Sequence, residues 1–219
     1  MRWFGWGPPR GEGDAGVVGD EVVVTGLPAL RMPEGAQGRP AMLDAAAAAS
    51  AGVAFGLPLD AIRVALESFS PLPHRGSVVA RIGSVRFIDD SKATNPHAAL
   101  AATEGLRGAV LIAGGLAKGV DLSPLAAAAP NLSAVVAIGD AAPAVAAAFE
   151  GLVPVHRAGT IEEAVDLAYR AAGAGGDVVL APACASQDMF RDYAERGDRF
   201  AGAARRLAGH LLQAGRSHA

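Results

Sequence analysis

The segment VRFIDDSKATNP, residues 85–96, decides how this chain folds. Its first four residues form a short apolar run that is typical of a buried strand, and Asn95 followed by Pro96 is a typical start of a helix. Carboxylate, ammonium and hydroxyl groups lie between the two. Ligands of open α/β sheets bind at this position, where a strand ends and a helix begins. Since a helix start offers free backbone N–H groups, the segment predicts a site for a phosphate or a carboxylate.

Short apolar runs alternate with helical segments from Arg75 onward. The predicted strands are residues 77–82, 85–89, 109–113, 134–138, 153–155 and 177–180, and the predicted helices are 96–104, 123–129, 141–149, 161–172 and 188–213. This alternation is typical of a mostly parallel sheet with helices on both faces. Because only Gly83 and Ser84 separate the first two strands, we expect a hairpin that adds one antiparallel strand. The pattern predicts an α/β, Rossmann-like domain, although no Gly-x-Gly-x-x-Gly fingerprint follows a strand.

Residues 1–70 have a different pattern, rich in glycine and proline at first and rich in alanine later. The elements expected there are strands around Trp3 and at residues 21–25, and helices at 41–54 and from Pro58 onward. Large apolar side chains are too sparse for residues 1–40 to bury a core alone. We therefore place a domain boundary within residues 70–75. We expect residues 1–70 to be an incomplete domain and residues 71–219 to be a complete one.

The composition argues against several classes of protein. Among the 219 residues, 19 are basic and 22 acidic, and no basic tract stands out, which argues against a nucleic-acid partner. The single cysteine, Cys184, rules out an internal disulfide and fits a reducing compartment. The alanine-rich run at residues 45–54 is too short and too weakly apolar to span a bilayer, and the amino terminus lacks the apolar core of a signal peptide. We expect a cytoplasmic protein with no membrane partner.

Four polar clusters lie at the domain boundary or after predicted strands. They are LPHR at residues 72–75, DSKATN at 90–95, GGLAKG at 114–119 and PACASQD at 182–188. Arg75 can fork onto phosphate oxygens and His74 can stack on a base or titrate, but for this cluster alone an ordinary solvated linker is the favoured interpretation. Lys118 offers a cation beside closely approaching backbone, or belongs to an ordinary flexible turn. Ser186 can cap the next helix and donate to a bound carboxylate.

Two further features of these clusters leave alternatives open. Cys184 is either a nucleophile or a buried small side chain, and the second role is favoured because no histidine is close in sequence. Asp121, Asp188 and Asp192 do not have the spacing of a recognisable metal site. No metal ligand is predicted.

In order and spacing, these clusters resemble those of a known family. The chain is similar to the carboxy-terminal portion of the D-glutamate-adding Mur ligases, the UDP-N-acetylmuramoyl-L-alanine:D-glutamate ligases of peptidoglycan synthesis. The matching pieces are residues 72–75, 90–95, 114–118, 121–125, 182–186 and 190–200, and the match extends over residues 57–208. The resemblance implies a Mur ligase carboxy-terminal domain for residues 71–219. It also implies that residues 1–70 are the tail of the central, ATP-hydrolysing domain.

The activity implied by the resemblance is ATP-dependent amide ligation. ATP phosphorylates the carboxylate of UDP-MurNAc-L-alanine, and the amine of D-glutamate attacks the resulting acyl phosphate. ATP and Mg²⁺ would serve the complete enzyme. The residues implied for D-glutamate are Lys92, Thr94, Lys118, Ser186 and Tyr193, with Asn95 and Gln187 in support. Those implied for nucleotide are His74, Arg75 and Asp90.

The chain departs from the family pattern in its first part. The Gly-Lys-Thr phosphate loop, the UDP-binding domain and the magnesium-binding residues of the family have no match here. Residues 40–45, PAMLDA, replace a His-Asn-x-x-Asn-Ala run. We therefore expect these 219 residues to bind neither ATP nor Mg²⁺ stably and to be inactive alone, with UDP-MurNAc-L-alanine bound by the missing domains.

Three alternatives to an inactive fragment remain open on sequence grounds. The chain could be a stand-alone binding or regulatory module, one half of a split enzyme, or part of a ligase for another amino acid. Apolar surface bared by truncation would also favour self-association.

Overall fold

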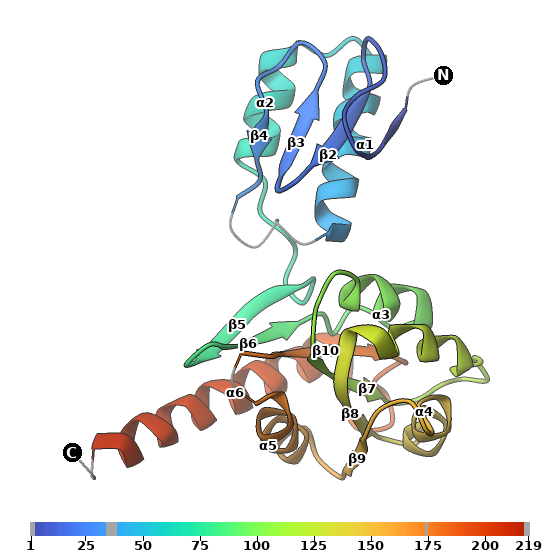
Figure 1. The fold of residues 1–219 in the computed structure, drawn as a ribbon, viewed down its shortest axis with the longest axis vertical. Coiled ribbons are helices and arrows are strands. Elements are labelled where there is room, and N and C mark those ends of the chain that lie inside the picture. The colour runs from blue at the N-terminus through green and yellow to red at the C-terminus, as the bar shows by residue number, and fades with distance from the viewer. Residues whose placement is uncertain (1–2, 34–38, 174, 217–219) are drawn as a thin grey trace. The chain divides into compact units, whose positions relative to one another are not determined.

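The computed structural model describes residues 3–33, 39–173 and 175–216. The chain divides into two compact units, Met1–Leu72 and Pro73–Ala219, called unit 1 and unit 2 below (Figure 1). Each unit has its own sheet and its own apolar core.

Unit 1 contains a small four-stranded sheet that packs against two helices. Its strands, in the order in which they pair, are β1 (Phe4–Trp6), β2 (Ala15–Val18), β3 (Glu21–Val24) and β4 (Leu30–Arg31), and its helices are α1 (Arg39–Ala54) and α2 (Leu59–Glu67). β1 runs parallel to β2, and the other pairs are antiparallel. The core joins Val17 and Val22 of the sheet to Met42 and Ala46 of α1 and Ile62 of α2. The strands thus bury their apolar face against the helices that follow them. β2, with four residues, and β4, with two residues, were not predicted from the sequence.

Unit 2 contains a six-stranded sheet that confirms the predicted α/β fold. Its strands are β5 (Ser77–Ile82), β6 (Val85–Asp89), β7 (Ala109–Gly114), β8 (Leu132–Ile138), β9 (Val155–Ala158) and β10 (Asp177–Ala183), in the order β5-β6-β10-β7-β8-β9. β5 and β6 form the predicted antiparallel hairpin, and all the other pairs are parallel. The helical segments are α3 (Pro96–Thr103), η1 (Ser123–Asn131), α4 (Ala142–Ala148), α5 (Ile161–Ala172) and α6 (Tyr193–Arg216).

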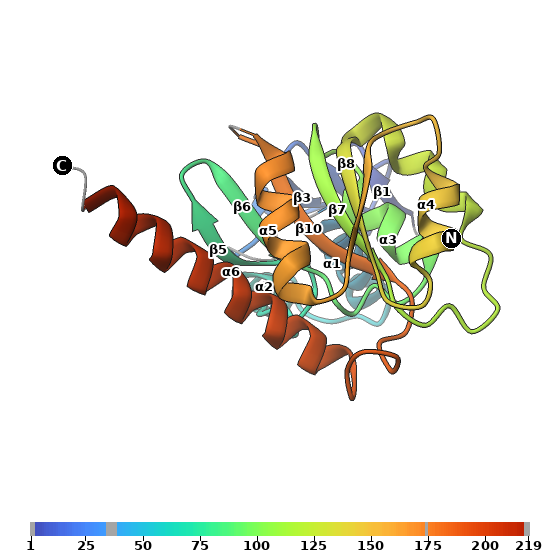
Figure 2. The same cartoon turned by 90° about the horizontal axis from the view of Figure 1, so that it is seen from below.

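Both faces of this sheet are buried, because successive side chains of a strand point to opposite faces. Along β7, Val110 and Ile112 belong to the core beneath α5 and α6, whereas Leu111 and Ala113 belong to the core beneath α3, η1 and α4. Figure 2 shows α5 and α6 together on their side of the sheet. Because both faces are buried, the central strands of this sheet are continuous apolar runs in the sequence.

Several element boundaries differ from the sequence prediction by one to five residues, and three elements differ for identifiable physical reasons. The strand predicted at residues 153–155 is shifted to β9, Val155–Ala158, because half of its residues are polar and exposed at the sheet edge. The segment after Ser123 is a 3₁₀ helix, in which Pro124 and Pro130 lack the N–H groups of a continuous α-helical ladder. The last helix starts at Tyr193 and not at residue 188, because residues 186–190 form a turn closed on the carbonyl of Ser186.

Candidate functional site

Three of the four polar clusters lie at one edge of the sheet of unit 2. β6, β10 and β7 are adjacent and parallel, so their carboxyl ends point the same way. The loops that leave these ends are residues 90–95, 184–192 and 115–122. The order of the strands in the sheet therefore brings together clusters that are far apart in sequence.

The fourth cluster is attached to this edge through His74. Its ring atom Nδ1 lies 2.7 Å from Oδ2 of Asp89, and both side chains are largely buried. Its backbone carbonyl accepts a hydrogen bond of 3.2 Å from the N–H of Lys92. Its ring also packs edge-on against Tyr193, with 6.1 Å between ring centroids. His74 adopts a φ of 63°, which is unusual for a residue with a side chain and indicates that these contacts hold the backbone in place.

A glycine in α6 leaves room for this histidine. A Cβ atom at position 197 would overlap Nδ1 of His74 and would lie 2.8 Å from Oδ2 of Asp89. Glycine is unfavourable inside a helix, so its presence at Gly197 is explained by the close approach of the imidazole.

The buried guanidinium of Arg196 links the loops after β6 and β10. Its Nε and a terminal nitrogen donate to Oγ and the carbonyl of Ser91, at 3.0 and 2.9 Å. The other terminal nitrogen donates to the carbonyls of Cys184 and Ala185, at 3.2 and 3.3 Å. The side chain is fully buried, and burial lowers the pKa of the guanidinium to about 10, so it stays charged at neutral pH. A planar fork of donors suits this arrangement of carbonyl oxygens better than an ammonium group does.

The glycine-rich loop after β7 lies directly against the loop after β10. Leu116 and Ala185 form an isolated bridge with two backbone hydrogen bonds, of 2.9 and 3.1 Å. A Cβ at Gly115 would overlap the carbonyl of Ala185, and one at Gly114 would overlap the carbonyl of Ile138. The two glycines therefore allow a close backbone approach, as the sequence suggested.

The residues expected to hold D-glutamate lie on these loops with different exposures. Nζ of Lys92 lies 5.4 Å from the ring centroid of Tyr193, a side chain that is itself 36% exposed. Thr94 and Lys118 are exposed and Ser186 is buried. Within the part of the chain that the structure describes, no hydrogen bond or ion pair joins the side chains of Thr94, Lys118 and Ser186.

Asn95 and Gln187, the residues expected to support the D-glutamate site, have different structural roles. Oδ1 of Asn95 accepts a hydrogen bond of 2.9 Å from the N–H of Ala98, and Pro96 is the first residue of α3, so the predicted helix cap is confirmed. Gln187 is an exposed side chain in the loop after β10. Ser186 is not a helix cap, because Asp192 caps α6 by accepting from the N–H of Glu195 at 2.8 Å.

Asp90 is the carboxylate of this edge with the most perturbed acidity. Burial and, to a smaller extent, the negative charge of Asp89 raise its pKa to about 6, although the positive charge of Arg75 partly offsets them. Arg75 is exposed. A half-buried acid beside an exposed guanidinium is an arrangement that can receive hydroxyl donors and an anion together.

The residues that organise the edge were not singled out individually from the sequence. These are Asp89, Ser91, Arg196 and Gly197. The glycine in a long helical pattern next to an arginine was the one local signal available. Asp188 was considered only as a metal ligand: its Oδ2 accepts from the N–H of Asp140 at 2.9 Å, and its Oδ1 is buried without a hydrogen bond among the described residues.

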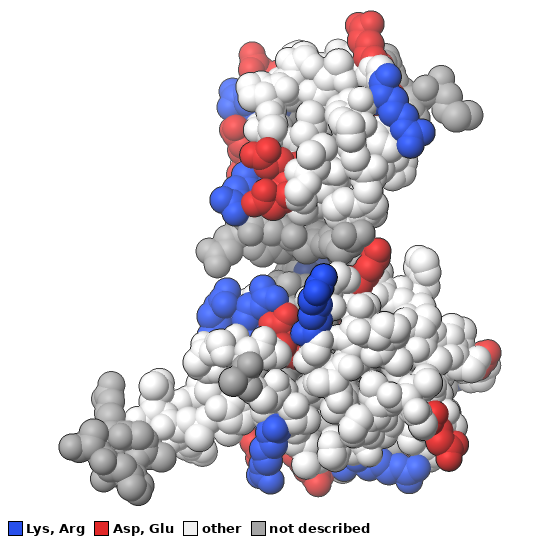
Figure 3. Space-filling model, in the orientation of Figure 1, with Lys and Arg blue, Asp and Glu red and all other residues white. Residues whose placement is uncertain are grey.

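Four broader predictions concern the burial of Cys184, metal ligands, membrane-spanning helices and the distribution of surface charge. Cys184 is 2% exposed and burial raises its pKa to about 11, which confirms the prediction of a buried side chain. Among residues 3–33, 39–173 and 175–216, no group of three or more His, Cys, Asp or Glu side chains could hold a metal, and no helix is both long and apolar enough to cross a membrane. Figure 3 shows basic and acidic side chains interspersed on the visible face of each unit.

Comparison with known sequences identifies relatives over most of the chain. The profile of the family "Mur ligase, glutamate ligase domain" matches residues 74–184. A UDP-N-acetylmuramoylalanine–D-glutamate ligase from Frankia casuarinae is 49% identical over 170 residues, which are 76% of this chain and 36% of the relative. A ligase of the same name from Methylococcus capsulatus is 43% identical over 190 residues, 85% of this chain and 41% of the relative. The chain thus spans about two fifths of the length of these relatives.

Solved structures share the fold at low sequence identity. A pseudomurein peptide ligase type C from Methanothermus fervidus has a TM-score of 0.62 at 16% identity, over 91% of this chain and 42% of that one. The UDP-N-acetylmuramate-alanine ligase of Thermotoga maritima has a TM-score of 0.59 at 17% identity, over 84% and 43%. The family profile, the curated relatives and the shared fold agree, and the chain belongs to the Mur ligase family.

Proposed function

We propose that this chain supplies the amino-acid-binding part of a ligase that joins D-glutamate to UDP-MurNAc-L-alanine with ATP. The observation that carries the proposal is the meeting of three loops at one sheet edge. Arg196 joins the loops after β6 and β10, and the Leu116–Ala185 bridge joins the loop after β7 to them. Relatives that are 43% and 49% identical bear the name of this ligase, which favours D-glutamate over other amino acids.

The proposed D-glutamate site lies between the loops after β6, β7 and β10. Lys92 and Lys118 provide two cations for a dicarboxylate, and Thr94 and Ser186 provide hydroxyl donors. Tyr193 packs against His74 and lies near Lys92, so it limits where the ammonium of Lys92 can point. These residues bind and orient the amino acid, and its amine is left free to attack.

The proposed nucleotide contacts lie beside this site, on residues 74–90. Asp90 would accept hydrogen bonds from ribose hydroxyls, Arg75 would bind phosphate oxygens, and His74 would border the base or sugar. The half-buried carboxylate next to an exposed guanidinium fits such a ligand. ATP supplies the phosphoryl group that activates the acceptor carboxylate. None of the described residues is assigned to Mg²⁺.

We infer that the complete reaction needs more chain than these 219 residues. They contain no Gly-Lys-Thr phosphate loop, and residues 40–45 lack the amide and imidazole side chains of the family pattern. The residues that bind UDP-MurNAc-L-alanine and Mg²⁺ would then come from the remaining three fifths of a family member. Residues 1–70 would be the tail of the central domain.

A nuclear magnetic resonance titration with D-glutamate tests the binding proposal, because it detects weak binding and reports where it occurs. We expect D-glutamate to shift the amide signals of residues 90–95, 115–119 and 184–193, and L-glutamate and L-lysine to have less effect. The Lys118→Ala variant should weaken the D-glutamate response, whereas Arg107→Ala, a change at another exposed cation, should not. Equal responses to D- and L-glutamate, or shifts confined to unit 1, would contradict the proposal.

A further inference from the structure

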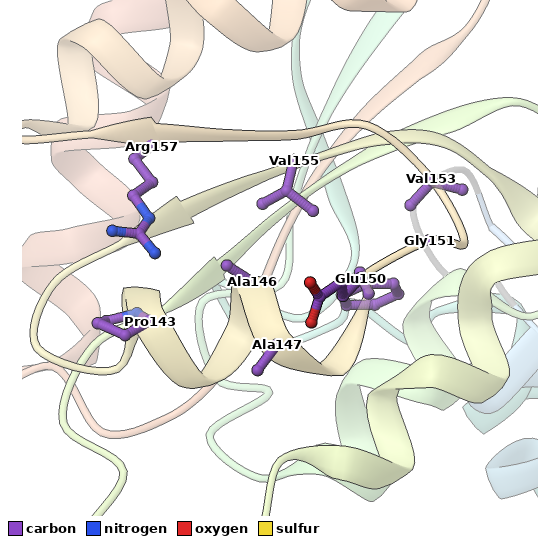
Figure 4. Close-up of a pocket in the computed structure, with 9 residues that line it drawn as sticks. Pro143, Ala146, Ala147, Glu150, Gly151, Val153, Val155 and Arg157 are labelled. Carbon is purple, nitrogen blue, oxygen red and sulfur yellow. The ribbon is translucent and has the colours of Figure 1, made fainter.

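A shallow trough of about 440 Å³ lies between α4 and β9, at the outer edge of the sheet of unit 2 (Figure 4). Its lining is mostly small or apolar and includes Pro143, Ala146, Ala147, Phe149, Val153 and Val155. Arg157 lies at one end, above Pro143, and Glu150 lies toward the other, beside Gly151. The trough belongs to a different part of the unit from the loops described above.

The two charged groups of the trough, Arg157 and Glu150, make no side-chain ion pair or hydrogen bond with any described residue. Both side chains are exposed. The trough thus offers a positive end, an apolar middle and a negative end.

The trough is bordered by the edge strand β9, one side of which is not paired with any described strand. β9 is the last strand in the sheet order, and it pairs only with β8 among the described strands. The carbonyl of Pro154 accepts from the N–H of Val135 in β8, at 2.9 Å. Because backbone groups alternate along a strand, those of Val155 and Arg157 point to the open edge. The same two residues direct their side chains into the trough, so the backbone edge and the trough can bind one partner together.

We propose that this edge binds a second copy of the same chain, through antiparallel pairing of the two β9 strands about a two-fold axis. In the pairing centred on His156, Val155 of each copy is hydrogen-bonded opposite Arg157 of the other. Each Arg157 then extends along the neighbouring trough toward Glu150 of the second copy. The two sheets become one continuous sheet, with both ion pairs related by the axis.

Charge complementarity favours a second copy over an unrelated strand. A trough with opposite charges at its two ends is self-complementary under a two-fold axis, as an isologous interface requires. A short, charged edge strand normally prevents pairing, and the guanidinium of Arg157 does so unless the partner supplies an acid at the right place. Pro143 and Ala147 on the exposed side of α4 allow the two helices to approach. The contact is small, so the dimer should be weak and depend on concentration.

Reversing the charges one at a time tests the proposal. Sedimentation velocity of the whole chain, over about a hundredfold range of concentration, should show a monomer–dimer equilibrium. Glu150→Arg alone and Arg157→Glu alone should each shift the sample to monomer, because like charges then meet at both ends. An equimolar mixture of these two variants should dimerise again, since each supplies the charge that the other lacks.

The matched control is Arg107→Glu, an equal change of charge at an exposed arginine in the loop before β7. It should leave the dimer unchanged, and circular dichroism should show that all the variants are folded. A wild-type chain that remains monomeric at every concentration would overturn the proposal. So would a dimer that survives both single reversals, because it would use another surface. None of these results depends on D-glutamate binding.

Discussion

Nδ1 of His74 lies 2.7 Å from Oδ2 of Asp89, and this contact joins the start of unit 2 to the end of β6. The same histidine touches Tyr193 and accepts a hydrogen bond from Lys92. Residues proposed for nucleotide and for D-glutamate are therefore in direct contact. A ligand that moves a residue proposed for nucleotide should therefore also shift a residue proposed for D-glutamate.

The fit of this histidine predicts that Gly197→Ala destabilises the protein. Alanine in a helix normally gains about 1 kcal/mol over glycine, but a methyl group here would displace the imidazole of His74. We expect the free energy of unfolding of the Gly197→Ala variant, measured with urea, to be about 1–3 kcal/mol lower than that of the Gly209→Ala variant. Gly209 is the control, since a methyl group there meets no atom within 4 Å. Equal stabilities of the two variants would show that His74 does not occupy this space in solution.

The buried guanidinium predicts a large effect for Arg196→Lys. Lysine keeps the charge but cannot reach the carbonyls of Ser91, Cys184 and Ala185 together, so buried acceptors lose their donors. We expect a loss of about 2–4 kcal/mol in unfolding free energy. Arg199→Lys is the control, because Arg199 is half exposed and pairs with Glu162 at 2.9 Å. That change should cost less than about 1 kcal/mol. Similar losses of unfolding free energy in the Arg196→Lys and Arg199→Lys variants would contradict the proposal that Arg196 links the two loops.

The acidity of Asp90 predicts how stability varies with pH. Its pKa in the folded chain is about 6, above the ordinary value, so the folded state holds the proton more tightly than the unfolded state does. The contribution of this group therefore favours folding at low pH and is lost as pH rises toward 6. Asp90→Asn should match the wild type near pH 4 and exceed it by on the order of 1–2 kcal/mol at pH 7.

Asp121→Asn provides a control of opposite sign. Hydrogen bonds from Ser123 lower the pKa of the exposed Asp121, so its ionised form supports the folded state and that support is lost only in acid. This variant should be slightly less stable than the wild type at neutral pH. Thermal unfolding across pH 4–8 distinguishes the two cases, and a pH-independent difference for Asp90→Asn would refute the assignment.

The strand–loop pattern predicted the sheet of unit 2 well, because strands buried on both faces are continuous apolar runs in the sequence. β9 was misplaced because half of it is exposed, and β4 was missed because it is only two residues long. The predicted first residue of a helix was wrong where a turn precedes the helix, as it does before Tyr193.

The candidate site could be predicted only in part. Polar residues after strands are visible in a sequence, and their meeting at one edge follows from the strand order. Arg196 and Asp89 act through buried contacts with residues far away in the chain, and no local pattern specifies such contacts. Gly197 is understandable only once the ring of His74 is placed beside it.

The ring of Tyr193 predicts different results for two substitutions. Tyr193→Phe keeps the surface that contacts His74 and lies near Lys92, whereas Tyr193→Ala removes it. Measured in the chimera described next, the alanine variant should raise the KM for D-glutamate by about threefold to tenfold, and the phenylalanine variant should have less than about a twofold effect. Equal effects would mean that the hydroxyl group, and not the ring, matters.

We infer above all that the loops after β6, β7 and β10 form the D-glutamate site. The most direct measurement uses a chimera in which residues 73–219 replace the matching part of the Frankia casuarinae ligase. Product formation from UDP-MurNAc-L-alanine and ATP is then followed with D-glutamate or L-glutamate. We predict activity with D-glutamate, little with L-glutamate, and a loss of about a hundredfold or more when Lys92 and Lys118 are both changed to alanine. A folded chimera that shows no preference between the two enantiomers, or that keeps its activity without both lysines, would contradict the claim.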